Sequence, residues 1–90
     1  MPPVTIRILG INGANSWSPN PATLQVGQEV RWRNDDPALP HKANGSGFDT
    51  GVLVPGQTSA PFTFSNPGQI NYECGIHPGQ MSGGVLNVTQ

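Results

Sequence analysis

Glycine and proline recur often along this chain and divide it into short segments. The 90 residues include 12 glycines and 10 prolines, and the apolar runs between them are only a few residues long. Both residue types are unfavourable inside helices and favourable in turns. Several runs alternate apolar and polar residues, which is the period of a half-buried strand, and none shows the helical period. The sequence therefore predicts short β-strands at 4–9, 22–26, 29–34, 51–54, 61–64, 69–74 and 85–89.

This succession of strands and turns is typical of an all-β domain, either a β-sandwich or a barrel with Greek-key connections. The polar segments 10–21 and 42–49 are predicted to be loops, and Trp17 in the first is expected to pack over the core. A chain of this length makes one domain at most, so we expect a single domain over residues 1–90. Its core is small, and a bound metal ion would help to stabilise it.

Few side chains are charged, which excludes some classes of partner. The chain has 4 basic and 5 acidic residues and a net charge of −1, so the clustered Lys and Arg of a nucleic-acid site are not expected. No stretch approaches the roughly 18 consecutive apolar residues of a membrane span. Met1-Pro2-Pro3 does not resemble a signal peptide, so Met1 is either a natural start or a start placed after a removed leader.

Residues with metal-binding side chains gather near the C-terminus. Cys74 is the only cysteine of the chain, and His77 and Met81 follow it within eight residues. Two histidines, one cysteine and a distant methionine are the ligands of blue copper sites, and His41 is the only other histidine. Taken singly, each side chain would more often be structural, as a buried cysteine usually is. Their joint occurrence predicts a mononuclear copper site, for which the fold must bring His41 close.

The segment 72–83, which contains this group, resembles part of a known family. Its Tyr-Glu-Cys-Gly-Ile-His-Pro-Gly run, followed by Met81 and Gly83, resembles the ligand loop of the cupredoxins. Within that family, it is most similar to the small plastocyanin-, amicyanin- and pseudoazurin-like blue copper proteins. Supporting matches spread over most of the chain, at 30–34, 48–51, 55–56, 62–64 and 67–68. The resemblance implies an antiparallel Greek-key β-sandwich.

The resemblance also implies a ligand set and a mode of action. His41, Cys74 and His77 would be the equatorial ligands of one copper ion per chain, and Met81 the weak axial ligand. The ion would cycle between Cu(II) and Cu(I), which makes the chain an electron carrier and not an enzyme. Redox partner proteins would dock briefly near His77, on an apolar patch of Leu39, Pro40, Ile76, Pro78 and Gly79. Because copper of this kind is handled outside the cytoplasm, we expect a monomeric periplasmic or extracellular protein.

Two positions depart from the pattern of the family. Met81 lies four residues after His77, whereas amicyanin-like loops have a spacing of three and plastocyanin-like loops of five. Gln80 occupies the three-residue position, but a thioether is the usual axial ligand, so we favour Met81. Lys42 follows His41 where the family often has Asn, Ser or Thr, and its backbone N–H can still donate to the Cys74 sulfur.

Other functions use the same residues. A copper carrier or chaperone would exchange the ion, although Met1 is the only further methionine. Two histidines are too few for a complete multicopper enzyme, but the chain can be a cupredoxin domain of a larger copper enzyme. If Met81 does not reach the metal, an open red copper site results. A zinc site of two His and one Cys is a further alternative, against which the axial methionine argues. A metal-free adhesive sandwich would leave the spacing as coincidence.

Overall fold

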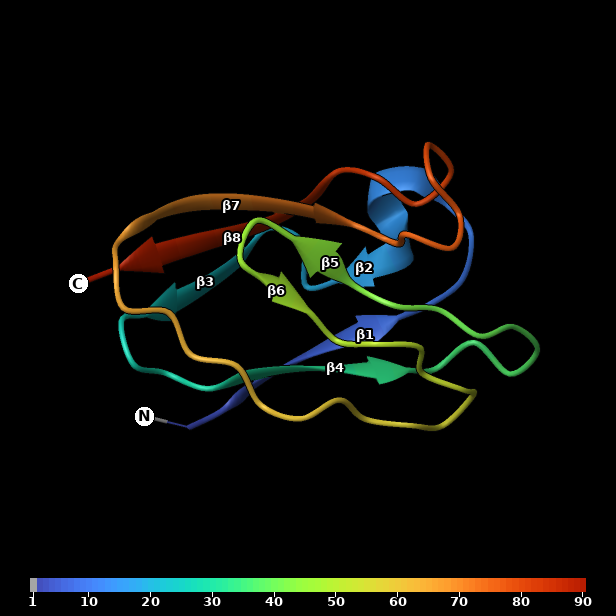
Figure 1. The fold of residues 1–90 in the computed structure, drawn as a ribbon, viewed down its shortest axis with the longest axis horizontal. Helices are drawn as coiled ribbons and strands as arrows, with labels where there is room; N and C mark the ends of the chain where they lie inside the picture. Colours follow the sequence, from blue (N-terminus) through green and yellow to red (C-terminus); the bar gives the residue numbers. More distant parts are fainter. Residues whose placement is uncertain (1) are drawn as a thin grey trace.

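Two β-sheets lie face to face in the computed structural model, which describes residues 2–90 (Figure 1). The first sheet has three strands, in the order β2 (Trp17–Ser18), β1 (Val4–Ile8) and β4 (Val30–Asn34). The second has five, in the order β3 (Ala22–Gln25), β8 (Gly84–Thr89), β7 (Gly68–Glu73), β5 (Asn44–Gly45) and β6 (Phe48–Asp49). A short 3-10 helix, η1 (Gly13–Ser16), precedes β2. The described part of the chain contains no helix that could span a membrane.

The predicted β-sandwich is confirmed, but its sheets are mixed and not wholly antiparallel. β1 pairs in parallel with β4, and β3 pairs in parallel with β8, while the remaining strand pairs are antiparallel. Between β1 and β4 the chain visits the second sheet and then returns to the first in its original direction. Neighbouring strands that are joined through the opposite sheet can therefore run parallel, which the antiparallel expectation did not include.

The prediction of a loop at 42–49 is wrong, because this segment forms the β5–β6 hairpin of the second sheet. Asn44 pairs with Glu73, and Gly45 pairs with Tyr72, so β7 supplies the partner for the hairpin backbone. The local composition is polar and rich in glycine, as in a loop. Pairing with a distant strand, which composition does not reveal, decides the outcome.

The predicted strands at 51–54 and 61–64 are reduced to isolated bridges. Leu53 pairs with His41 in the first segment, and Phe62 pairs with Val30 in the second. Proline has no N–H to donate to a ladder, and Pro55 and Pro61 border or begin these segments. The pairing therefore stays short at both places.

Aromatic side chains from both sheets meet in the core between them. Val30 and Trp32 point inward from β4, as the alternation of that strand predicts. Trp17 lies in β2 rather than in a loop, and only 2% of it is exposed, so its predicted packing role is confirmed. The Trp32 and Phe48 rings stack with centroids 5.0 Å apart, and Tyr72 meets Trp17 and Trp32 edge-on at 4.8 and 5.3 Å. Such pairs contribute about 0.5–1.5 kcal/mol each beyond the area that they bury.

Tyr72 fits into the second sheet because its two cross-strand neighbours are glycines. It pairs with Gly45 of β5 on one side and with Gly84 of β8 on the other. A Cβ atom at Gly84 would overlap the Tyr72 ring, and one at Gly45 would lie 3.0 Å from Tyr72 Cβ and 2.9 Å from Phe48 Cε1. Neither glycine has a positive φ, so space and not backbone conformation requires them.

We expect Gly84→Ala to lower the free energy of unfolding by about 1–3 kcal/mol, the usual cost of an extra methyl group in a packed site. The Tyr72 ring would have to leave its rotamer, or β8 would have to shift. Urea denaturation followed by tryptophan fluorescence measures the change. Asn87→Ala, at a half-buried position of the same strand, is the control and should change stability by less than about 0.5 kcal/mol. Equal stability of Gly84→Ala and the wild type would contradict this packing.

Candidate metal centre

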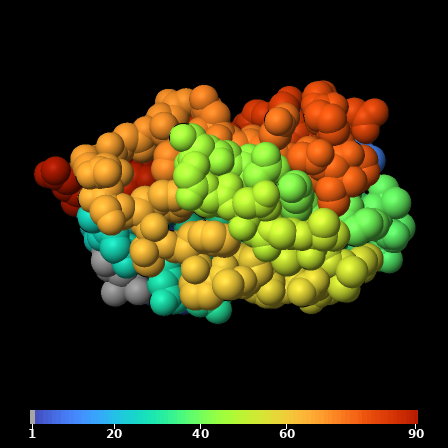
Figure 2. Space-filling view, in the orientation of Figure 1, coloured from blue at the N-terminus to red at the C-terminus, as the bar shows by residue number. Residues whose placement is uncertain are grey.

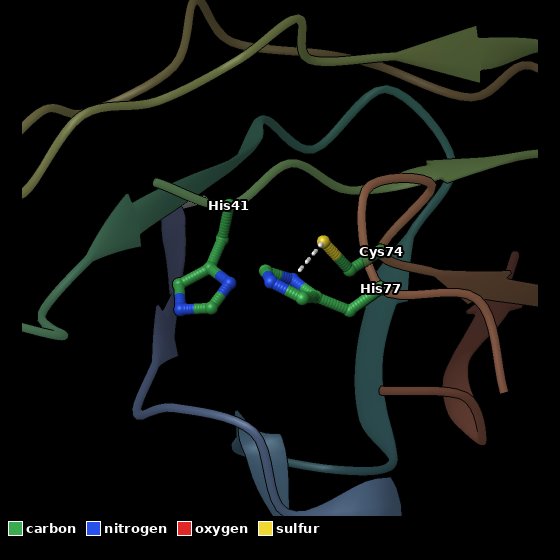
Figure 3. A group of neighbouring side chains, drawn as sticks. All are labelled: His41, Cys74 and His77. Atoms are coloured by element: carbon green, nitrogen blue, oxygen red, sulfur yellow. Dashed lines mark hydrogen bonds between the residues drawn. The ribbon is translucent and has the colours of Figure 1, made fainter. Parts of the chain in front are cut away.

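Segments that are far apart in the sequence lie side by side at one end of the sandwich. The turn after β4, the segment 50–56 and the loop between β7 and β8 form adjacent parts of the surface there (Figures 1 and 2). His41 ends the turn, Cys74 directly follows β7, and His77 belongs to the loop. One ligand atom from each of these three residues lies within 4.8 Å of the others (Figure 3). The fold therefore brings His41 to the pair that the sequence places together.

The geometry of the three side chains fits a shared metal ion. The sulfur of Cys74 lies 3.6 Å from Nδ1 of His77, and the rings of the two histidines are 5.0 Å apart between centroids. Metal bonds to nitrogen and sulfur are about 2.0–2.3 Å long, so two atoms bound to the same ion can be as far apart as the Cys74 sulfur and His77 Nδ1 are here. His41 and Cys74 are fully buried, whereas His77 is partly exposed. The cluster is thus closed from the core side and reaches solvent through His77.

The two ring nitrogens of His41 have different surroundings. Nε2 lies 2.7 Å from Oδ2 of Asp36, whereas Nδ1 is buried without a hydrogen-bond partner. Figure 3 shows one nitrogen of the ring facing His77 and the other directed away. Buried polar atoms are nearly always paired, so an unpaired one inside this cluster fits a metal ligand. The pKa of Asp36 lies below its usual value, mainly because of the hydrogen bond with His41. The hydrogen bond from the Ala38 N–H lowers this pKa further.

Backbone hydrogen bonds hold His41 against the segment 50–56. His41 and Leu53 exchange both of their backbone bonds, at 3.1 and 2.7 Å. The Asn34 side chain donates to the carbonyl oxygens of Leu39 and Leu53, each at 2.9 Å, and is itself fully buried. Asn34 and Asp36 are absent from the sequence-based ligand set. The sequence indicates a supporting role only for Asn34, which is a polar residue at an inward-facing position of β4.

The loop that carries Cys74 and His77 is closed on itself. Cys74 N–H donates to the carbonyl of Met81 at 3.1 Å, and the N–H of Met81 donates to the carbonyl of His77 at 3.2 Å. The Gln80 carbonyl accepts from Gly13 N–H at 2.8 Å, which joins the loop to η1. The Lys42 N–H lies 3.4 Å from the Cys74 sulfur, so this predicted contact is confirmed. A loop tied at several points can hold its side chains in one geometry.

Met81 and Gln80, the two candidates for an axial ligand, lie in different surroundings. Met81 is fully buried within the core cluster, whereas the Gln80 side chain is exposed. The loop therefore directs the Met81 side chain into the protein and the Gln80 side chain toward solvent. A bond from either residue to a metal stays a prediction.

Exposed apolar residues lie in both segments that carry the cluster, just before His41 and on either side of His77. Leu39 is 40% exposed and Ile76 is 39% exposed, and the other residues of the predicted patch, Pro40, Pro78 and Gly79, are exposed as well. Leu9 and Ile11 are further exposed apolar residues, in the segment that follows β1. The sequence did not indicate these two.

Known structures share this fold over nearly the whole of this chain. Sequence comparison matches no family model and no curated protein. A copper-containing nitrite reductase from Thermus scotoductus SA-01 superimposes with a TM-score of 0.81 and 30% identity over 99% of this chain, which spans only 23% of that one. A purple cupredoxin from Nitrosopumilus maritimus has a TM-score of 0.81, 26% identity, and coverage of 96% of this chain and 99% of its own.

An oxidised amicyanin mutant, at 22% identity, shows likeness of fold alone, with a TM-score of 0.77 and coverage of 94% of this chain and 80% of that one. The same architecture therefore occurs both as a chain of similar length and as part of a longer enzyme chain.

We expect Met81→Ala to lower the free energy of unfolding of the metal-free protein by about 2–5 kcal/mol, because it leaves a cavity in the core. Gln80→Ala, one residue away and exposed, should change it by less than about 0.5 kcal/mol. Chemical denaturation in the presence of a chelator compares the two variants. A similar loss in both would show that the loop does not direct Met81 inward and Gln80 outward.

Proposed function

Because this chain is a cupredoxin, with the β-sandwich of its structural neighbours, we propose that it is a mononuclear copper electron-transfer protein. The observation that carries the proposal is the grouping of His41, Cys74 and His77 within 4.8 Å. One thiolate and two imidazoles are the equatorial donors of a blue copper site. Copper, when bound, would supply a one-electron couple between Cu(II) and Cu(I).

The residues around the cluster prepare it for such an ion. His41 offers its unpaired Nδ1, His77 offers Nδ1, and Cys74 offers its sulfur. The Lys42 N–H donates to that sulfur and so stabilises negative charge on it. Met81 would be the weak fourth ligand, since its side chain is buried beside the loop that holds Cys74 and His77. Backbone bonds across this loop keep the donors in place, which limits their movement when the charge changes.

The exposed edge of His77 marks the proposed route for electrons. His77 is the partly exposed ligand of the three, and it lies among the exposed apolar residues Leu39 and Ile76. We place the transient contact with redox partner proteins on this patch. Interfaces of electron-transfer complexes are small, so a patch of this kind provides enough area for a brief contact. As part of the same proposal, the protein acts as a monomer in the periplasm or outside the cell, because copper of this kind is handled outside the cytoplasm.

A second candidate function is a copper domain of a larger enzyme. The 30% identity to part of a copper-containing nitrite reductase favours it. Both histidines of the chain already belong to one cluster, so any further metal of such an enzyme would need ligands from elsewhere. Genomic or mass-spectrometric determination of the natural chain length distinguishes the two candidates.

Titration of the metal-free protein with Cu(II) should produce an intense orange-red absorption band that saturates at one copper per chain. The band reports a bond between a Cys thiolate and Cu(II), so Cys74→Ser should abolish it. Titration with Zn(II), which has no redox or colour change of its own, is the control and should stay colourless. A coloured Cys74→Ser variant, or a wild type that binds no copper, would overturn the assignment.

The axial ligand can be identified by two neighbouring substitutions. Met81→Ala should keep copper but change the colour and the reduction potential, because the axial ligand tunes both. Gln80→Ala should leave both properties unchanged. Visible absorption and electrochemistry of the copper-loaded variants measure the effect. If Gln80→Ala produces the change and Met81→Ala does not, then Gln80 is the axial ligand.

A further inference from the structure

Asp36 is a buried carboxylate at the back of the His41 ring. It is 8% exposed, and its Oδ2 lies 2.7 Å from His41 Nε2. Its Oδ1 accepts from the backbone N–H groups of Ala38 at 2.9 Å and Leu39 at 3.4 Å. Each oxygen of the carboxylate therefore already has a hydrogen-bond partner.

An ionised carboxylate can only accept hydrogen bonds, so the proton of a neutral His41 ring must lie on Nε2. Nδ1 then carries a lone pair, and this is the nitrogen that is buried without a partner beside Cys74 and His77. The hydrogen bond of one ring nitrogen thus decides the chemical character of the other.

Hydrogen bonds and ion pairs also hold the backbone that leads into Asp36. The backbone N–H of Asp36 donates to Asn34 Oδ1 at 3.0 Å. The preceding residue, Asp35, accepts from Arg7 and Arg33, and its N–H donates to the Ile8 carbonyl at 2.9 Å. Hydrogen bonds from Arg33, which has the larger effect, and from Arg7 hold the pKa of Asp35 at about 2, so the ion pairs persist at neutral pH. The turn after β4 is consequently fixed on both sides of Asp36.

We propose that Asp36 is a positioning residue that fixes the tautomer and orientation of His41, so that Nδ1 would offer its lone pair to a bound metal ion. The effect of Asp36 on copper binding rests on the proposed function, whereas the tautomer of His41 is a property of the metal-free chain. Outer partners of histidine ligands typically contribute 10–100-fold to metal affinity.

An amide cannot replace this carboxylate. In Asp36→Asn, one of the two acceptors becomes an NH₂ group that faces a donor. If the amide oxygen stays with the Ala38 N–H, the NH₂ group donates to His41 Nε2. The proton of His41 must then move to Nδ1, where it blocks the lone pair. If the amide turns the other way, Ala38 loses its acceptor and the turn loosens.

The test compares wild type, Asp36→Asn and the charge-matched control Glu29→Gln. Glu29 is an exposed carboxylate that pairs with Arg31 just before β4, at the opposite end of that strand from Asp36. The ¹⁵N chemical shifts of the His41 ring, recorded on the metal-free proteins at mildly alkaline pH, identify the protonated nitrogen. Competition with a chelator of known affinity then measures Cu(II) binding.

We expect the proton of His41 on Nε2 in wild type and Glu29→Gln, and on Nδ1 in Asp36→Asn. Cu(II) affinity should fall 10–100-fold in Asp36→Asn and stay unchanged in Glu29→Gln. A wild-type His41 that carries its proton on Nδ1 would overturn the inference, even if Asp36→Asn does not fold, and would leave the copper assignment standing. Wild-type affinity in Asp36→Asn would overturn it as well. Failure of the wild type to bind copper would overturn the proposed function and leave the tautomer result intact.

Discussion

A fully buried imidazole with one nitrogen unpaired is the constraint on which this site depends. Leaving a buried polar atom without a partner costs roughly 1–3 kcal/mol, and His41 Nδ1 is such an atom. The surrounding chain compensates with the bond to Asp36 and the double backbone bridge to Leu53. A ligand that accepts the Nδ1 lone pair would remove the remaining cost. The metal-free protein is therefore already arranged around the place where an ion would bind.

The two sheets supply the rigidity that this arrangement needs. β4 and β7 both run toward the same end of the sandwich (Figure 1), where His41 lies in the turn after β4 and Cys74 directly follows β7. Behind them, Trp32 and Tyr72 pack edge-on in the core, which fixes the spacing between the sheets. Glycine at position 84 allows that packing. Core and candidate site are thus coupled, because the residues that set the spacing between the sheets also influence the distance between the segments that carry His41 and Cys74.

The surface over the site suits brief encounters. His77 is partly exposed, and the residues on either side of it in the chain, Ile76 and Pro78, are exposed and apolar, while the chain as a whole has a net charge of −1. Long-range steering by charge is accordingly weak, and contact area and fit would decide partner choice. The occurrence of the same fold in a longer nitrite reductase chain shows that this architecture is compatible with a fixed neighbour as well as with a transient one.

The sequence by itself determined the all-β class and predicted which residues gather in the candidate metal site. Alternation over 29–34 and 69–74 is a local property, and so is the Cys74–His77–Met81 spacing, so both can be recognised without tertiary contacts. The tertiary structure alone decided that 42–49 forms a hairpin, that two strand pairs run parallel, and that Asn34 and Asp36 support His41. Strand pairing and burial join residues far apart in the chain, and their energies depend on neighbours that no local pattern specifies.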